Sequence, residues 1–471
     1  GEWSIQLDSP GWYDVKVQAR TTAGKELDRN VTVAVLGTPI SEELRQKSVF
    51  GIWNVHGDSR LVKIAGAKWN RRMMSLRNVT KEQAAATTSE YAHFYSQKDG
   101  LEYLGVFAFG MPMWCMKVPE NYKRHGFGNP FFPAKSWNTV ADIVRAYAYI
   151  REIPETVEMY NEPLAHWKGD KTGLVAYAEA VRKGLKAANP KFKLAGPCLY
   201  SIRTGDLNAL ARAGLFKHLD AISMHAYVNG TPPEGQFLDK IIELNQLLTR
   251  YGQQGKPLYL TEFGWTASDG TWQPPVDRIT QTSYVARSLA LGWSQKIDAM
   301  IFFVLKYNTS NKGEAAFALL DKNDRPQPGY VSFSAVSRFF AGSKPFGHYQ
   351  LTPDVHMVAG KRGDKLQLAV WSTGKAIDIA LPFQITDASD IFGKKIVCDP
   401  KKIRCTENPV YLEAEADGVN GFKQLAPIKI TAGGTLPDKI DWPLQAMDKN
   451  MANLSAGHYA GFSKNKNTVG S

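Results

Sequence analysis

The sequence predicts an α/β protein with a (β/α)8 TIM barrel over residues 46–343. β-sandwich segments flank the barrel, a partial one at the N-terminus and another at the C-terminus. Three observations support this prediction. Eight short apolar runs follow one another in the central part, segments of helix length separate them, and polar residues end several runs abruptly. Short strands that alternate with helices are typical of βα units, and eight such units fit a closed barrel.

The N-terminal segment, residues 1–45, predicts part of a small β-sandwich. Apolar and polar residues alternate from Trp12 to Ala19 and again from Val31 to Val35, as half-buried antiparallel strands require. The residues from Thr21 to Lys25 are typical of a turn, so we expect a hairpin here.

The barrel strands are the eight apolar runs, and segments such as Gly173–Ala188 have the composition of the helices between them. A doubly wound open sheet is the alternative topology. It usually carries a glycine-rich phosphate turn after its first strand, which Gly51-Ile52-Trp53-Asn54 is not. The expected strands are Ser48–His56, Trp69–Leu76, Tyr103–Phe109, Thr156–Tyr160, Lys193–Pro197, Leu219–His225, Pro257–Glu262 and Ala299–Leu305.

The C-terminal part, residues 344–438, predicts a β-sandwich because helical periodicity stops and short strands such as Leu366–Trp371 and Ile377–Leu381 return. Neither flanking strand set shows a dense aromatic row, so we expect supports for the barrel rather than carbohydrate-binding modules. Residues 439–471 are rich in Asn, Lys and Gly, and form either an extended tail or a strap over another domain.

The composition is that of a soluble globular protein, with 44% hydrophobic and 22% charged residues. No apolar run is long enough to span a bilayer, and we expect no transmembrane segment. The N-terminus lacks a basic region followed by an apolar one, so no signal peptide is expected within these residues. We expect a monomer.

The formal net charge of +12 allows affinity for nucleic acid, a membrane surface or an acidic polysaccharide. The Lys and Arg residues are nevertheless spread along the chain, with only short clusters such as Lys394-Lys395. This spread favours the interpretation that the net charge serves only to keep the protein soluble, and we expect no nucleic-acid partner. A weak attraction to anionic polymers remains open.

Of the four cysteines, only Cys398 and Cys405 are close enough in sequence to suggest a local disulfide bridge, which would form if the compartment is oxidising. Cys115 and Cys198 are interpreted as buried thiols. No spacing typical of metal ligands occurs, so we predict no metal and no cofactor.

Two apolar strands end on glutamates. Asn161-Glu162 ends one strand, and Pro163 prevents its continuation; Glu262 ends another. Catalytic residues of such barrels lie at the carboxyl ends of strands, so both carboxylates should project into one mouth. Glycosidic cleavage needs one carboxyl group to protonate the leaving oxygen and another to attack or to activate water. Glu155 and Glu158 are interpreted as solvated loop residues or neighbours of a helix N-cap.

These motifs resemble glycoside hydrolase clan A, where an Asn-Glu-Pro ending strand four carries the acid/base and a Glu ending strand seven carries the nucleophile. Within the clan the sequence is most similar to family 39, which includes bacterial enzymes that cut biofilm exopolysaccharides. Three further motifs follow the clan's order: Gly66-x-x-Trp69-x-Arg71, Pro112-x-Trp114 and His225-x-Tyr227.

The resemblance implies a retaining, endo-acting hydrolase of a polysaccharide, secreted or periplasmic, with Glu162 as acid/base and Glu262 as nucleophile. Carried over, Asn161 binds the 2-hydroxyl of the −1 sugar. Arg71 and Tyr227 hold Glu262 ionised and oriented, and His225 lines the same floor. A retaining enzyme should hold its two carboxyl groups about 5 to 5.5 Å apart.

Aromatic residues gather near the predicted strand ends, where rings suit a polymer-binding cleft because sugars stack on them. His56 and His166 are candidates for the same cleft or ordinary loop histidines. Leu164-Ala165-His166-Trp167, directly after Asn-Glu-Pro, depart from better-known clan members, so we expect the local subsite contacts to differ. The aromatic candidates are Trp53, Trp114, Trp167, Trp265 and Tyr307, with Trp272 in the loop beyond.

Two other interpretations stay open. The barrel can belong to a cellulase-, mannanase- or xylosidase-like enzyme of the same clan. It can also belong to a non-catalytic polysaccharide-binding or assembly protein that works through its aromatic residues. The paired glutamates argue against the second, because a pure binder has no need of two opposed carboxylates.

Overall fold

The computed structural model describes residues 4–415 except 23, 55–57, 87, 89, 96–98, 123–130, 269–272 and 308–311. The chain divides into two compact units that alternate along the sequence. In described residues, the first unit comprises 4–68, 228–239 and 264–415, and the second comprises 69–227 and 240–263.

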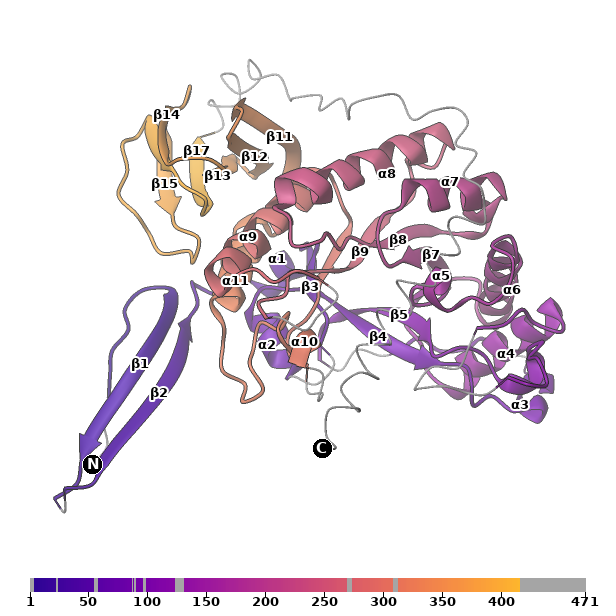
Figure 1. Cartoon of the computed structure of the whole chain (residues 1–471). Helices are drawn as coiled ribbons and strands as arrows, with labels where there is room; N and C mark the ends of the chain where they lie inside the picture. Colours follow the sequence, from indigo (N-terminus) through magenta and orange to yellow (C-terminus); the bar gives the residue numbers. More distant parts are fainter. Residues whose placement is uncertain are drawn as a thin grey trace. The chain divides into compact units, whose positions relative to one another are not determined.

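Eight parallel strands form a closed barrel in the order β10-β3-β4-β5-β6-β7-β8-β9, which confirms the predicted fold (Figure 1). Each strand coincides with one of the predicted apolar runs, although most are shorter by one or more residues. They are β3 (Phe50–Ile52), β4 (Trp69–Ser75), β5 (Glu102–Ala108), β6 (Thr156–Glu158), β7 (Lys193–Leu199), β8 (Ala221–His225), β9 (Leu258–Phe263) and β10 (Ala299–Phe302).

The register between β8 and β9 changes near the carboxyl ends of these strands. Met224 lies opposite Leu260, but His225 lies opposite Glu262 rather than Thr261. Such a bulge places two residues of one strand against one step of its partner. It therefore sets His225 beside Glu262.

Amphipathic helices cover the strands of each unit. In the second unit α4 and α6 lie side by side (Figure 1), and Gly184 permits this because a Cβ there would collide with the Ala141 carbonyl. The helices are α1 (Glu42–Gln46), α2 (Ser59–Ile64), α3 (Lys81–Ala85), α4 (Trp137–Ile150), α5 (Pro163–His166), α6 (Gly173–Ala188), α7 (Thr204–Arg212), α8 (Leu238–Arg250), α9 (Arg278–Ser294), α10 (Lys312–Ala315) and α11 (Pro328–Phe340); a 3-10 turn, η2, spans Leu215–His218.

The antiparallel strands belong to the first unit. The predicted hairpin is a two-stranded sheet, with Gly11 opposite Val35 at its open end. A five-stranded sheet in the order β11-β12-β13-β17-β15 and a pair β14-β16 share one apolar core that includes Leu368, Ile379 and Ile403. These strands are β1 (Gly11–Arg20), β2 (Glu26–Val35), β11 (Lys344–Thr352), β12 (Val355–Arg362), β13 (Lys365–Ser372), β14 (Ile377–Ala380), β15 (Ile385–Ser389), β16 (Lys402–Cys405) and β17 (Val410–Glu415).

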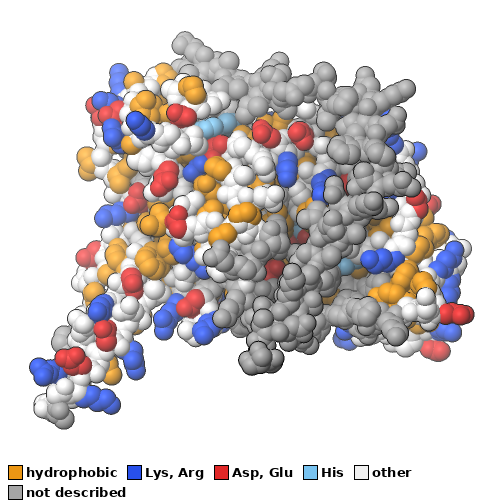
Figure 2. Space-filling model, in the orientation of Figure 1, with side chains coloured by type: hydrophobic (Ala, Val, Ile, Leu, Met, Phe, Trp, Pro, Cys, Tyr) orange, Lys and Arg blue, Asp and Glu red, His pale blue; other side chains and the backbone are white. Residues whose placement is uncertain are grey.

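The predicted domain boundaries stay predictions, and residues 439–471 lie outside the described part of the chain. Within the described residues, no helix has both the length and the apolar character needed to cross a membrane. On the face seen in Figure 2, basic and acidic side chains are interspersed among the described residues rather than gathered by sign. This agrees with the spread of charge along the sequence.

Candidate active site

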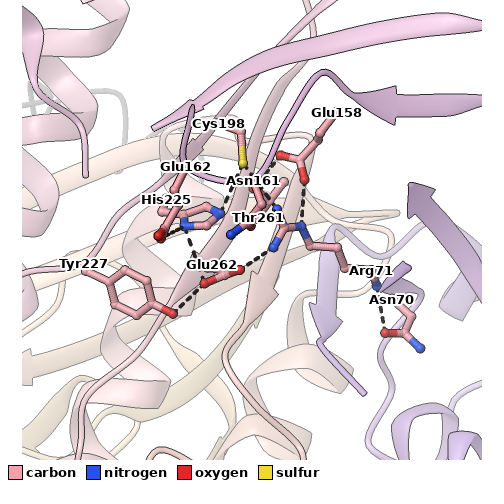
Figure 3. A network of polar contacts seen from close by, with 10 residues as sticks. All are labelled: Asn70, Arg71, Glu158, Asn161, Glu162, Cys198, His225, Tyr227, Thr261 and Glu262. Atoms are coloured by element: carbon pink, nitrogen blue, oxygen red, sulfur yellow. Dashed lines mark hydrogen bonds and ion pairs between the residues drawn. The ribbon is translucent and has the colours of Figure 1, made fainter. Parts of the chain in front are cut away.

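Residues on or directly after five barrel strands meet at a buried polar network within the second unit (Figure 3). Arg71 comes from β4, Cys198 from β7, His225 from β8 and Glu262 from β9, while Glu162 follows β6. Their side chains point toward one another in the figure. The network joins residues up to 191 positions apart in the sequence.

The backbone around Glu162 is fixed by the neighbouring strands. Asn161 N donates to the Phe107 carbonyl at 3.2 Å, and Glu162 N donates to the Cys198 carbonyl at 3.0 Å. Glu162 is the N-cap of α5 with a left-handed backbone, φ 50° and ψ 56°, and Pro163 follows as the first helical residue. The turn therefore ends β6 and aims the glutamate away from the strand direction.

Glu262 is a buried carboxylate held from three sides. Tyr227 OH donates to its Oε2 at 2.9 Å, His225 Nδ1 lies 3.4 Å from the same oxygen, and Arg71 Nη1 donates to Oε1. Burial raises the pKa of Glu262, and the Glu162 charge adds to this, while His225 and Arg71 oppose it. Arg71, Tyr227 and His225 supply the hydrogen bonds and positive charge that an ionised Glu262 needs, because burial by itself favours the neutral acid.

Arg71 is the centre of the network and is fully buried. Its Nε donates to Glu158 Oε2 at 2.7 Å, and its Nη2 donates to Asn161 Oδ1 at 2.8 Å and lies 3.3 Å from Cys198 Sγ. Burial alone lowers the pKa of a guanidinium, but the Glu158 and Glu262 charges outweigh it and raise the pKa of Arg71. One permanent cation thus serves two carboxylates.

The interpretation of Glu158 as a solvated residue was wrong. Its side chain is fully buried, pairs with Arg71 and accepts a hydrogen bond of 2.8 Å from Thr261 Oγ1. Burial raises the pKa of Glu158, but the Arg71 charge outweighs it and the pKa lies below its ordinary value. The physical reason is its place on β6, opposite Val106 and Ala195, rather than beyond the strand end.

His225 lies between the two candidate catalytic carboxylates. Its Nδ1 is 2.8 Å from Glu162 Oε1, and its Nε2 is 3.3 Å from Cys198 Sγ. Burial lowers the pKa of His225, but the Glu262 charge and the contacts with Cys198 and Glu162 raise it well above its ordinary value. A protonated ring can donate toward both a carboxylate and the thiol.

We expect the stability of the protein to fall as the pH rises above about 6.5, because the folded state then holds a proton on His225 that the unfolded state has lost. A histidine with a raised pKa contributes its full stabilisation below the unfolded value and loses it as the pH passes the folded value. Urea unfolding between pH 6 and 9 measures this slope. His225→Gln should flatten it.

The control for this series is His218→Gln, which changes a histidine in η2 outside the network. The control should unfold with the slope of the wild type. An unchanged slope in His225→Gln would show that His225 does not carry the proton.

The two carboxylates are close. One oxygen each of Glu162 and Glu262, with a ring nitrogen of His225, lie within 4.8 Å of one another. Two carboxylates and a histidine can also bind a metal ion. The adjacent Arg71 guanidinium disfavours a cation here, and the raised pKa of His225 opposes the neutral imidazole that a metal needs.

Three more predicted contact residues belong to this unit. Trp114 is half-buried and donates from its indole to the Val79 carbonyl at 3.0 Å. Trp167 packs edge-on against Phe131 and donates to the Asp170 carbonyl at 2.6 Å. His166 lies 6.1 Å from the Tyr160 ring, centroid to centroid.

Three others belong to the first unit. Trp265 packs between Phe237 and Tyr284 and donates to the Thr231 carbonyl at 2.9 Å. Trp53 and Tyr307 lie 5.1 and 5.8 Å from the Phe303 ring. His56 and Trp272 lie outside the described residues.

Cys198 is a site residue that the sequence interpretation took for an ordinary buried thiol. It is buried, as expected, but its sulfur contacts both Arg71 and His225. The sequence offered one indication of this role, since Cys198 lies at the end of β7 and residues at strand ends contribute to this site. All four cysteines are free thiols in the structure, including Cys398 and Cys405, between which the sequence allowed a disulfide bridge.

Comparisons with known proteins agree on the fold. No family model and no curated protein matches the sequence. Among solved structures, a family 39 glycoside hydrolase from Bacteroides cellulosilyticus WH2 is similar, with a TM-score of 0.68 and 16% identity over 87% of this chain and 89% of that chain.

Two other solved structures are similar at lower scores. They are a GH30 endoxylanase from Clostridium papyrosolvens C71 (TM-score 0.54, 10% identity, 79% and 96% of the two chains) and a GH39 β-xylosidase from Caulobacter crescentus (0.53, 13%, 81% and 98%). Identities this low show the fold alone. The chain therefore has the barrel fold found in glycoside hydrolases of families 39 and 30.

Proposed function

We propose that the protein is a retaining glycoside hydrolase with Glu162 as general acid/base and Glu262 as nucleophile. The observation that carries the proposal is the pair of carboxylates, which stand at the carboxyl ends of barrel strands with an oxygen of each within 4.8 Å. Retaining enzymes hold their carboxyl groups about 5 to 5.5 Å apart, and inverting ones roughly 6.5 to 9.5 Å. The short distance supports direct attack by Glu262.

The surroundings of Glu262 suit a nucleophile. Arg71 and Tyr227 stabilise the negative charge of Glu262, which then attacks the anomeric carbon while Glu162 gives its proton to the leaving oxygen. Glu162 next removes a proton from water, which attacks the same carbon and releases Glu262. His225 Nδ1 lies 2.8 Å from Glu162 and 3.4 Å from Glu262, so a protonated ring can stabilise whichever of the two carboxylates is ionised at each step.

The proposed substrate is a polysaccharide, cut internally by a secreted or periplasmic enzyme. The motif resemblance to family 39, which includes exopolysaccharide hydrolases, supports this assignment. Similar solved structures named as an endoxylanase and a β-xylosidase favour a xylan-type substrate as the second candidate. A non-catalytic binding role would leave the buried charge network around Glu262 without a purpose.

We expect the wild type to release oligosaccharides from one polymer in a panel of bacterial exopolysaccharides and plant glycans. Reducing-end assays and mass spectrometry measure this release. Because double displacement inverts the anomeric carbon twice, the first product should keep the anomeric configuration of the substrate, which proton NMR detects within minutes of mixing. A product of opposite configuration would exclude the covalent mechanism.

A parallel incubation with Glu262→Gln serves as the control for contaminating hydrolases. Release by the wild type alone supports the assignment and identifies the polymer. Tight binding without release by either protein would support the non-catalytic role instead.

A further inference from the structure

A cavity lies between β4 and the neighbouring helices α3 and α4, within the second unit. The two helices contact each other beside it (Figure 1). Its volume is about 390 Å³, which falls within the range of small-molecule sites, roughly 300 to 1,000 Å³. The polar side chains of its lining that carry the inference are Arg72, Asn78, Gln83, Arg151 and Glu152.

Arg72 brings a guanidinium to this cavity. Arg71 and Arg72 follow each other on β4, and successive side chains of a strand point to opposite faces. Arg71 belongs to the network around Glu262, whereas Arg72 lines the cavity. The guanidinium carbon of Arg72 lies 4.0 Å from the centroid of the Tyr95 ring. This stacking holds the plane of the group but accepts none of its N–H donors.

The cavity contains buried polar atoms that are not hydrogen-bonded. Arg72 Nη1 is buried and has no hydrogen-bond partner among the described residues, and the same holds for Ser75 Oγ in the lining. Arg72 forms no ion pair within that part of the chain. Buried donors are nearly always paired in folded proteins, because an unmade hydrogen bond costs free energy. A guanidinium can only donate, so its missing partner is an acceptor.

The charges of the lining favour an acceptor with a single negative charge. Arg72, Arg151 and Glu152 together carry one positive charge in excess, and none of the three forms an ion pair among the described residues. A carboxylate balances this excess, and its two oxygens match the parallel N–H donors of a guanidinium. A dianion such as phosphate would exceed it and would be repelled by Glu152.

The remaining polar groups suit the hydroxyls of a sugar. Gln83 Oε1 accepts a hydrogen bond of 2.9 Å from Thr80 N, which leaves the amide nitrogen of Gln83 as a donor. Asn78 adds a second amide, and the exposed Glu152 carboxylate is an acceptor. A sugar hydroxyl both donates and accepts, so amides and a carboxylate can bind it together. A simple fatty acid would leave these groups unused.

We propose that this cavity binds a sugar acid. Arg72 binds its carboxylate, Arg151 adds positive charge, and the amides with Glu152 contact its hydroxyls. The site is separate from Glu162 and Glu262, because Arg72 lies on the face of β4 opposite to Arg71. It therefore does not depend on the proposed hydrolase function.

Titration calorimetry on the full chain tests this proposal with glucuronate and galacturonate, each compared with its neutral sugar, glucose or galactose. At least one sugar acid should bind at least about tenfold more tightly than its neutral counterpart, as expected for a charge-assisted hydrogen bond. Inorganic phosphate should bind more weakly than that sugar acid. Arg72→Gln should bring the affinities for the acid and the neutral sugar close together.

The matched control is Arg77→Gln, which changes an exposed arginine just beyond β4 and should keep the wild-type affinity. Thermal unfolding without ligand establishes that each variant is folded. If Arg72→Gln does not fold, Arg72→Lys and Arg151→Gln replace it. Arg72→Lys loses the paired donors and Arg151→Gln removes an exposed charge, so both should weaken binding of the sugar acid but not of the neutral sugar.

Glu262→Gln locates the ligand, because Glu262 belongs to the candidate active site and not to the cavity. This variant should bind the sugar acid as the wild type does. Binding that changes in Glu262→Gln but not in the Arg72 variants would overturn the cavity site. Equal affinity for acids and neutral sugars, tighter binding of phosphate, or no binding of either acid would overturn it as well. None of these outcomes involves turnover, so the hydrolase function is judged separately.

Discussion

Glu262→Gln is expected to lower kcat by roughly four to six orders of magnitude, as loss of a nucleophile does in enzymes whose residues act together. The amide fills the same space and can still contact Tyr227 and Arg71, but it cannot form the glycosyl ester. Steady-state and single-turnover rates on the polymer identified above measure the loss. An activity within tenfold of the wild type would remove Glu262 from the mechanism.

The partner experiment uses Glu162→Ala, whose loss should be smaller because general acid catalysis contributes about 10² to 10⁴. A small nucleophilic anion such as azide should restore part of the activity, since it needs no base to attack the glycosyl-enzyme. The matched control is Glu155→Gln, an exposed glutamate of the same unit that pairs with Lys193 at 2.8 Å. It should keep wild-type rates.

Arg71→Met is expected to destabilise the protein by about 3 to 5 kcal/mol, because it leaves Glu158 and Glu262 buried without their cation. Chemical denaturation with urea measures the free energy of unfolding. The double variant Arg71→Met with Glu158→Gln should recover part of the loss, since it removes one of the unpaired charges.

Lys193→Met is the control, because it breaks an ion pair whose partners are about half exposed. Such a pair contributes at most about 1 kcal/mol. If Arg71→Met costs no more than this control, the buried network is not what stabilises the second unit. If the double variant regains no stability, the unpaired charge of Glu158 is not the cause of the loss in Arg71→Met.

The barrel was predictable because its signal is local. Each strand is a short apolar run, each helix an amphipathic segment, and Pro163 marks the turn after Glu162. The two glutamates could be singled out because residues at strand ends of such a barrel meet at one mouth. None of these inferences requires knowledge of which side chains touch.

Glu158 and Cys198 could not be assigned in the same way, because their roles depend on distant partners. Glu158 pairs with a residue 87 positions away, and Cys198 contacts one 127 positions away. A glutamate inside an apolar strand is a weak signal that a cation must lie nearby. Identifying Arg71 as that cation required the register of the barrel strands.

A position at the end of a strand places a residue at the mouth of the barrel but does not set the direction of its side chain. Trp265 follows Glu262 by three residues, yet its ring packs between Phe237 and Tyr284. Sequence position alone does not separate an aromatic residue that binds sugar from one that packs.

At residue 162 the backbone conformation and the proposed chemistry favour different amino acids. Its left-handed conformation costs a side chain about 1 kcal/mol relative to glycine, and the proline that follows restricts the residue further. Protein stability alone would favour glycine or asparagine here, and neither can protonate a leaving oxygen. A programme of stabilisation guided only by backbone preference would therefore select, at residue 162, the substitutions that abolish the proposed chemistry.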